Sequence, residues 1–203
     1  MTLYKHNCAG CHGDQGRGGV AISLANPIYL ATAGIDNIRR ITTQGVPGTM
    51  MPAFGKEQGG LLTEEQISIL SKGMLDAWAH PDVLHGLLPL AYAKAQEGDA
   101  ARGQLAFAVS CARCHGADGK GTDAGASLHG ASIVDPSYLA LISDQGLRSI
   151  IISGQPERGM PDWRTDIQGS PLRTMTGEEI SDIVAWLAAH RTQTPGQPYA
   201  EVK

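Results

Sequence analysis

Apolar residues recur with helical spacing in two stretches of the chain. The first stretch carries them at i, i+3 and i+7 and the second at i, i+3, i+4 and i+7: Ile67, Leu70 and Met74, then Ile180, Ile183, Val184 and Leu187. A capping box precedes each stretch, Thr63-Glu64-Glu65-Gln66 in the first half and Thr176-Gly177-Glu178-Glu179 in the second. In such a box a hydroxyl and a side chain three residues later satisfy free N–H groups at a helix start. The pattern therefore predicts helices that begin at Thr63 and Thr176, each with an apolar stripe that needs a partner.

The composition suits a soluble globular protein of one or two small domains, since the 203 residues are 42% hydrophobic and 18% charged. Aromatic residues make up only 5% of the chain, whereas there are 26 glycines and 11 prolines. Protein side chains alone would build thin, loop-rich cores from this mixture. We therefore expect another group to fill part of the interior.

Charge and hydropathy argue against two classes of protein. The formal net charge is −4, and only Arg39 and Arg40 form an adjacent basic pair, whereas nucleic-acid binding needs a concentrated basic patch. There is no run of 18 or more apolar residues, so the sequence predicts no membrane-spanning segment in this chain. The first six residues also lack the charged and apolar regions of a secretory signal.

The four cysteines fall in two five-residue words of one pattern, Cys8-Ala9-Gly10-Cys11-His12 and Cys111-Ala112-Arg113-Cys114-His115. C-x-x-C-H is the attachment sequence of c-type haem. Two thiols three residues apart can each add to a vinyl group on one porphyrin edge, and the next residue then lies beneath the iron. Neutral imidazole is a strong ligand for haem iron, so the pattern predicts two covalent haem c groups with His12 and His115 as proximal ligands.

Three other uses of paired cysteines compete with this interpretation. Structural zinc knuckles usually lie about 15–20 residues apart, whereas these pairs start at Cys8 and Cys111. A redox-active dithiol belongs near a strand in a βαβ pattern, which the glycine-rich segments after the two words do not offer. Plain disulfides would not require a histidine after each pair.

An internal repeat identifies a second pair of iron ligands. The haem words are offset by 103 residues, which places Tyr4 on Phe107. Further along, Asn26-Pro27-Ile28-Tyr29-Leu30-Ala31 matches Asp135-Pro136-Ser137-Tyr138-Leu139-Ala140 at an offset of 109. That offset places Met51-Pro52 on Met160-Pro161, whereas Met50 has no counterpart.

A thioether is a weak, soft ligand that stabilises ferrous iron, so we expect Met51 and Met160 to complete His/Met ligation of the two irons. The alternative for an isolated methionine is a side chain that fills a gap in the core. We expect that packing role for Met50, Met74 and Met175.

With a haem word, a glycine-rich turn, a Met-Pro word and a capped helix in this order twice, the chain resembles a tandem di-haem class I cytochrome c over nearly its whole length. The resemblance implies an all-α fold with two tandem cytochrome c-type domains, each made of a few short helices and long loops around one covalent haem c. We expect the first domain at residues 1–79, a linker at 80–97, the second domain at 98–192 and a C-terminal tail at 193–203.

In that family a short helix before the haem word carries a glycine four residues before an aromatic residue. Gly103 and Phe107 fit this pattern, whereas the glycine that would match Tyr4 falls before Met1. We therefore expect the N-terminal helix of the first domain to be truncated and a longer precursor to carry a signal or anchor upstream. The resemblance also implies a periplasmic location, or one on the extracytoplasmic face of a membrane, because haem is attached there.

The family often places Pro-x-Leu-x-Gly after the haem turn, where the proline carbonyl accepts the imidazole N–H and orients the ring. This chain has Ile22 and Ala126 at the proline position, and we expect their carbonyls to serve. Trp163 follows the second Met-Pro word and could pack near the haem edge or in an ordinary core. The histidines without a repeated partner are expected in surface or linker positions: His6, His80, His85, His129 and His190.

These features favour one-electron transfer through two His/Met-ligated haems, either as a di-haem carrier or as the electron-transfer subunit of a respiratory complex. The chain would then not be an enzyme, and its partners would be redox proteins or subunits of a membrane respiratory complex. The alternative is a small di-haem oxidoreductase that acts on a sulfur oxyanion or on peroxide. Such an enzyme needs an iron with an open or displaceable ligand, and two methionine ligands argue against it.

Overall fold

The computed structural model describes residues 2–122, 132–164 and 174–192. Its regular elements are helices, and the described residues form two isolated bridges but no strand. The all-α fold class is therefore confirmed. In chain order the elements are α1 (Thr2–Asn7), α2 (Ala9–His12), α3 (Pro27–Gln44), η1 (Lys56–Gln58), α4 (Glu64–Trp78), α5 (Ala100–Ser110), α6 (Ala112–His115), α7 (Pro136–Leu141), α8 (Asp144–Ser153), η2 (Pro156–Arg158) and α9 (Gly177–Ala188).

Packing divides the chain into two compact units. The first contains residues 1–93 together with 149–165, and the second contains residues 94–148 together with 166–203. The division falls inside α8, so the segment that follows this helix packs with the first half of the chain. The domain boundaries that the repeat suggests stay a prediction.

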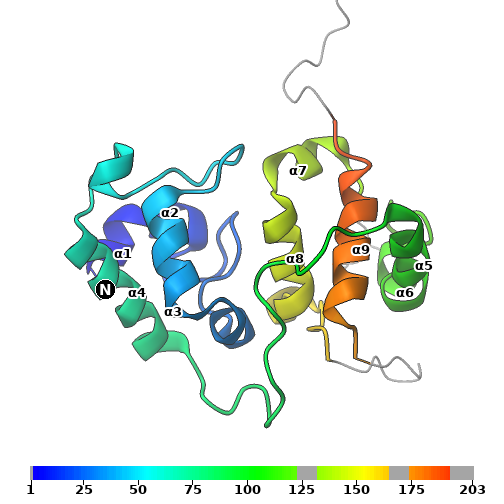
Figure 1. The fold of residues 1–203 in the computed structure, drawn as a ribbon, viewed down its shortest axis with the longest axis horizontal. Helices are drawn as coiled ribbons and strands as arrows, with labels where there is room; N and C mark the ends of the chain where they lie inside the picture. The colour runs from blue at the N-terminus through cyan, green and yellow to red at the C-terminus, as the bar shows by residue number, and fades with distance from the viewer. Residues whose placement is uncertain (1, 123–131, 165–173, 193–203) are drawn as a thin grey trace, which may run out of the picture. The chain divides into compact units, whose positions relative to one another are not determined.

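In the first unit, α3 and α4 pack together around a core that also takes in α1 (Figure 1). The apolar stripe of α4 is buried, as its spacing predicts. The Tyr4 ring meets the Trp78 ring edge-on, with the ring centroids 5.1 Å apart. The short helix α1 is thereby fixed against the C-terminal end of α4, directly before the first haem word.

In the second unit, α5 and α9 lie side by side (Figure 1). Their close approach depends on Gly103, where an added Cβ would lie 1.9 Å from the backbone oxygen of Asp182. One turn further along α5, the Phe107 ring packs on the Trp186 ring with the centroids 4.3 Å apart. The glycine and aromatic pair predicted from the family pattern is therefore what brings these two helices together.

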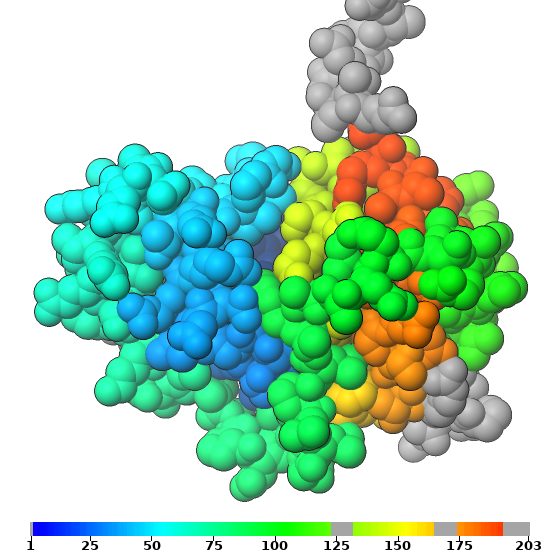
Figure 2. Space-filling model, in the orientation of Figure 1, coloured from blue at the N-terminus to red at the C-terminus, as the bar shows by residue number. Residues whose placement is uncertain are grey.

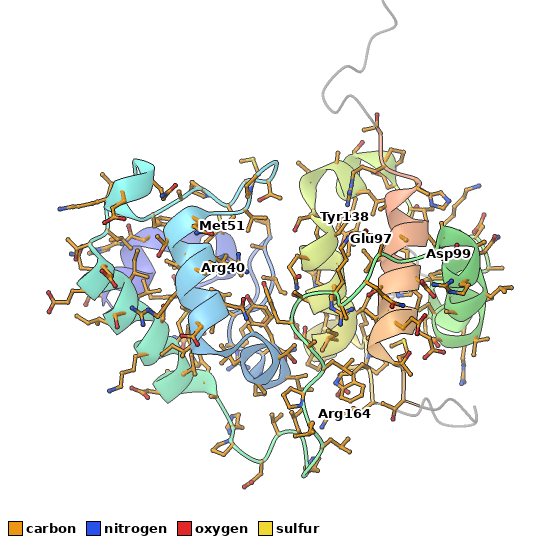
Figure 3. The ribbon with its side chains drawn as sticks, viewed as in Figure 1. Arg40, Met51, Glu97, Asp99, Tyr138 and Arg164 are labelled. Carbon is orange, nitrogen blue, oxygen red and sulfur yellow. The ribbon has the colours of Figure 1, made fainter. Side chains whose placement is uncertain are left out.

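An ion pair joins the start of α5 to α9 near the same crossing of the two helices. Arg102 donates from Nε and Nη2 to the two carboxylate oxygens of Asp182, at 2.8 and 2.9 Å. The backbone N–H of Asp99, which caps α5, donates to Asp182 as well, at 2.7 Å (Figure 3). The segment leading into α5 covers part of α9 (Figure 2), and an added Cβ on Gly98 there would meet the backbone oxygen of Ser181.

The two capping boxes form as the sequence predicts. Thr63 and Thr176 are the N-caps of α4 and α9, and each hydroxyl accepts the N–H of the residue three positions later. Gln66 and Glu179 return the interaction through their side chains, which accept the backbone N–H of the capping threonine. The repeat extends to the middle helices, because Asn26 caps α3 and Asp135 caps α7, each followed by proline.

Candidate haem-binding sites

The two C-x-x-C-H words have nearly the same backbone geometry. Cys8 has φ −121° and ψ −33°, and Cys111 has φ −124° and ψ −32°. The N–H groups of His12 and His115 donate to the carbonyls of these cysteines at 2.9 and 3.0 Å. One turn of helix thus carries both thiols and the histidine in each half, which is the spacing that covalent attachment to one porphyrin edge requires.

The helix before each word fixes where the first thiol lies. The N–H of Cys8 donates to the carbonyl of Tyr4 at 2.8 Å, and Cys111 makes the same bond to Phe107. The aromatic rings of Tyr4 and Phe107 are almost fully buried. In the first half the Tyr4 hydroxyl also donates to the carbonyl of Gly13 at 2.7 Å. Burial raises the pKa of Tyr4 to about 12, so this phenol remains a neutral donor that ties the helix to the turn after His12.

The His12 ring is held in one orientation by the backbone. Its Nδ1 lies 2.8 Å from the carbonyl oxygen of Ile22, and because a carbonyl can only accept, Nδ1 must carry the proton. Burial lowers the pKa of His12, although the bond to Ile22 acts in the opposite direction. A neutral ring protonated on Nδ1 leaves Nε2 free to bind a metal. The predicted role of the Ile22 carbonyl is confirmed, whereas Ala126, its counterpart, lies outside the described residues.

No disulfide joins any two of the four cysteines. Burial raises the pKa of Cys8 to about 11 and that of Cys111 to about 12, so both thiols are neutral near pH 7. Across the described ranges, no three histidine, cysteine or acidic side chains come together in a group that could hold a metal ion. Each unit thus contains one thiol pair beside its own histidine, Cys8, Cys11 and His12 in the first and Cys111, Cys114 and His115 in the second.

Two glycines shape the loops that carry Met51 and Met160. Gly45 and Gly154 have φ values of 69° and 65°, and an added Cβ on either would lie 2.6–2.8 Å from the backbone of the Met-Pro segment. The next N–H closes each loop, because Val46 donates to the carbonyl of Met51 at 3.0 Å and Gln155 donates to that of Met160 at 2.9 Å. Both methionines are half-buried. The same loop is therefore built twice, as the 109-residue offset predicts.

The methionines that have no counterpart in the repeat do not all pack in the interior, as was expected of them. Met74 is buried in the core of the first unit, and Met175 is half-buried. Met50, however, is 80% exposed, so the prediction that it packs in the interior is wrong. The Met-Pro loop turns Met51 inward and leaves its neighbour in solvent.

An aromatic residue follows each Met-Pro word, and sequence reasoning noted Trp163 but missed Phe54. Phe54 stands at the position of Trp163 under the 109-residue offset, and both donate a backbone N–H to the last turn of the preceding helix. Trp163 is 7% exposed, and its indole Nε1 is buried with no hydrogen-bond acceptor. A buried donor without a partner in the protein needs one from outside the chain, such as a water molecule or a bound group, and haem carries propionate carboxylates that can accept such a bond. The residues present therefore fit a haem.

The remaining histidines lie where the sequence suggests, as far as they are described. His6, His80, His85 and His190 are exposed, and His129 falls outside the described residues. His190 hydrogen-bonds through Nδ1 to the carbonyl of Trp186 at 2.9 Å.

The predicted ligands are distributed unevenly between the two units. Cys8, Cys11, His12 and Met51 all belong to the first unit. Cys111, Cys114 and His115 belong to the second unit, whereas the loop of Met160 packs with the first.

Comparison with known proteins gives a consistent result. The family model described as cytochrome c oxidase, cbb3-type, subunit III matches residues 1–71 and 98–187. Three similar proteins are named cbb3-type cytochrome c oxidase subunit CcoP. That of Rubrivivax gelatinosus is 30% identical over 91% of this chain and 51% of its own length, that of Cereibacter sphaeroides is 31% identical over 86% and 57%, and that of an Azospirillum strain is 27% identical over 86% and 58%. The chain thus spans about half the length of these relatives.

Among solved structures, a chain of the reducing HAO-like protein complex of Kuenenia stuttgartiensis matches with a TM-score of 0.50 at 16% identity, over 94% of both chains. This likeness supports the fold alone. None of the helices in the described part of the chain combines the length and apolar character that crossing a bilayer requires.

Proposed function

Because the chain belongs to the family of cytochrome c oxidase, cbb3-type, subunit III, we propose that it passes single electrons between redox proteins as the electron-transfer subunit of a membrane respiratory complex. The cytochrome c domains of this family, of which the family model matches two in this chain, bind covalent haem c. The observation that carries the proposal is the duplication of the parts, since the C-x-x-C-H turn and the Met-Pro loop each occur twice with nearly the same backbone geometry.

We assign the covalent attachment of the haems to Cys8 and Cys11 in the first half and to Cys111 and Cys114 in the second. His12 and Met51 would be the axial ligands of the first iron, and His115 and Met160 those of the second. When bound, each haem supplies an iron that cycles between the ferric and ferrous states, and a methionine ligand favours the ferrous state.

The protein's own contribution is to limit movement of the ligands. The Ile22 carbonyl fixes the His12 ring, the bond from Tyr4 to Gly13 anchors the adjacent turn, and Gly45 lets the backbone close over Met51. A ligand set that changes little between two oxidation states keeps reorganisation small, which is what electron transfer needs. No substrate has to bind and no bond has to be made or broken.

The partners and location follow from the named relatives. These are subunits of cbb3-type oxidases, so we propose that this chain meets the other subunits of such a complex and a redox protein that exchanges electrons with it. We also propose that it lies in the periplasm or on the extracytoplasmic face of the membrane, because haem c is attached there.

Substitution of two neighbouring methionines tests the ligand assignment. Met51→Ala should open the first iron, so that the ferric protein gains a high-spin signal and loses part of the sulfur-to-iron charge-transfer band. Met50→Ala is the matched control and should leave both irons low-spin, because its side chain is in solvent. The reverse outcome would overturn the assignment. A high-spin iron in the unaltered protein would instead favour a di-haem oxidoreductase.

A further inference from the structure

Hydrogen bonds, called ties below, join the loop that carries Met160 to residues of the first half of the chain. All the residues involved belong to the first compact unit, which contains residues 149–165 as well as 1–93. The ties occur at both ends of the loop, before Gly154 and after Pro161. They matter because Met160 is the axial ligand that we assign to the second iron.

The first tie comes from Asn26. Its side-chain Nδ2 donates to the carbonyl of Ser153 at 3.0 Å and lies 3.5 Å from that of Gly154. Asn26 is 6% exposed and Ser153 is 2% exposed, so water does not compete for these bonds. The last carbonyls of a helix have no partner within it, and here a side chain from 127 residues away supplies one at the end of α8.

Gly154 connects this tie to the methionine. An added Cβ on Gly154 would lie 2.7 Å from the backbone oxygen of Met160 and 2.6 Å from the carbonyl carbon of Pro161. Gln155 and Met160 also exchange backbone hydrogen bonds of 2.9 and 3.1 Å. Because these contacts leave the two segments little freedom to move relative to each other, the position of the end of α8 determines the position of the Met160 backbone.

The second tie comes from Arg164 and the linker. Arg164 donates through Nη1 to the carbonyl of Val83 at 2.8 Å (Figure 3). Its Nε and Nη2 donate to the two carboxylate oxygens of Asp162 at 3.0 and 3.2 Å, and both side chains are largely buried. Asp162 directly follows the Met160-Pro161 word, so the far end of the loop is also fastened to the first half of the chain.

The repeat shows that the Asn26 tie is a special feature of the first half. Asn26 and Asp135 occupy equivalent capping positions, and both accept backbone N–H groups at the start of a helix. Asp135 is exposed, and a carboxylate has no N–H to donate. Only the asparagine can cap its helix through Oδ1 and donate to a second segment through Nδ2.

We propose that Asn26, assisted by Arg164, is a positioning residue for the axial methionine of the second haem, so that the first repeat controls how firmly Met160 binds its iron. This inference rests on the proposed ligand set. Loss of the tie should loosen the Met160 loop while the covalent attachment at Cys111 and Cys114 and the His115 ligand stay in place.

Asn26→Asp tests the proposal in the full chain with both haems attached. This substitution keeps the capping oxygen for the N–H groups of Ile28 and Tyr29 but removes the donor and turns a carboxylate toward two carbonyl oxygens. It should be made in a Met51→Leu background, so that the sulfur-to-iron band reports the second haem alone. We expect that band to weaken. Carbon monoxide should bind the ferrous protein in two phases in this background, and we expect the slower phase, which reports the second haem because the first iron is already open, to become about tenfold faster, as loss of one buried hydrogen bond implies.

Three further variants keep the test decisive. Asn26→Ser retains a capping hydroxyl but cannot reach Ser153, so it replaces Asn26→Asp if the charged variant does not fold. Asp135→Asn is the matched control and should change neither reporter. An unchanged band and an unchanged rate in a folded Asn26 variant would overturn the proposal. Met160→Leu tests the ligand set separately from the role of Asn26. If this substitution left the band unchanged, Met160 would not be an iron ligand, and the inference would fail with the ligand set.

Discussion

Replacement of Gly103 by alanine should destabilise the second unit, although alanine is the better helix former. The added Cβ would lie 1.9 Å from the backbone oxygen of Asp182 and 2.9 Å from the Cβ of Trp186. Neither neighbour is the end of a flexible side chain. To reach an ordinary contact of 3.4 Å with the Asp182 oxygen, the two helices must separate by about 1.5 Å.

Such a separation removes much of the attraction across the crossing, because a gap of 0.5–1 Å already forfeits about a quarter to a half of the dispersion energy. Overpacking of this kind typically costs about 1–3 kcal/mol, and the rigid backbone contact places Gly103→Ala at the upper end. The gain in helix propensity offsets about 1 kcal/mol. We therefore expect the free energy of unfolding to fall by about 2 kcal/mol.

Gly73 offers a matched control because it lies inside α4, where an added Cβ would meet nothing within 4 Å. Gly73→Ala should raise stability by about 0.5–1 kcal/mol. Both variants can be compared with the parent by urea denaturation, followed by far-ultraviolet circular dichroism. If Gly103→Ala gained stability as the control does, the close crossing of α5 and α9 would be refuted.

Three further predictions concern stability. Arg102 holds the pKa of Asp182 below its ordinary 3.8, so their ion pair stabilises the fold above that pH and is lost as the pH falls through the lowered pKa. Asp182→Asn should therefore make the free energy of unfolding depend less on pH in this range. A pH profile that the substitution leaves unchanged would contradict the stabilising role of the ion pair. Thr176→Ala should cost about 1 kcal/mol in denaturant unfolding through loss of the α9 cap, and no cost would mean that the cap is dispensable. Met74→Ala should cost about 2–5 kcal/mol in the same assay, because Met74 is buried in the first core; a cost under 1 kcal/mol would contradict that burial.

Local patterns predicted much of the site because the chemistry itself is local. A haem word requires two thiols and a histidine within five residues, and a capping box requires two side chains within four. The choice of Met51 over Met50 needed only the offset between the two halves, and the exposure of Met50 agrees with it. The equivalence of Phe54 and Trp163 could have been found from the same offset.

Features that depend on distant residues could not be predicted in this way. Each unit places a tryptophan from its last long helix near the glycine of the haem turn: an added Cβ would lie 2.9 Å from Trp78 at Gly16 and 3.3 Å from Trp186 at Gly119. The two tryptophans are not equivalent in the repeat, so the alignment gives no sign of their shared role. Likewise, the side chain of Asn26 reads as a helix cap in the sequence, and only the fold shows its donor bond to Ser153.

The central claim is that this chain holds two covalent haems whose irons are both ligated by histidine and methionine. The most direct test is the ferric near-infrared spectrum of the purified full chain, with the intensity of the sulfur-to-iron charge-transfer band divided by the haem content found by mass spectrometry. We expect two haems per chain, each with a low-spin iron ligated by methionine. A high-spin iron, or a single haem per chain, would contradict it.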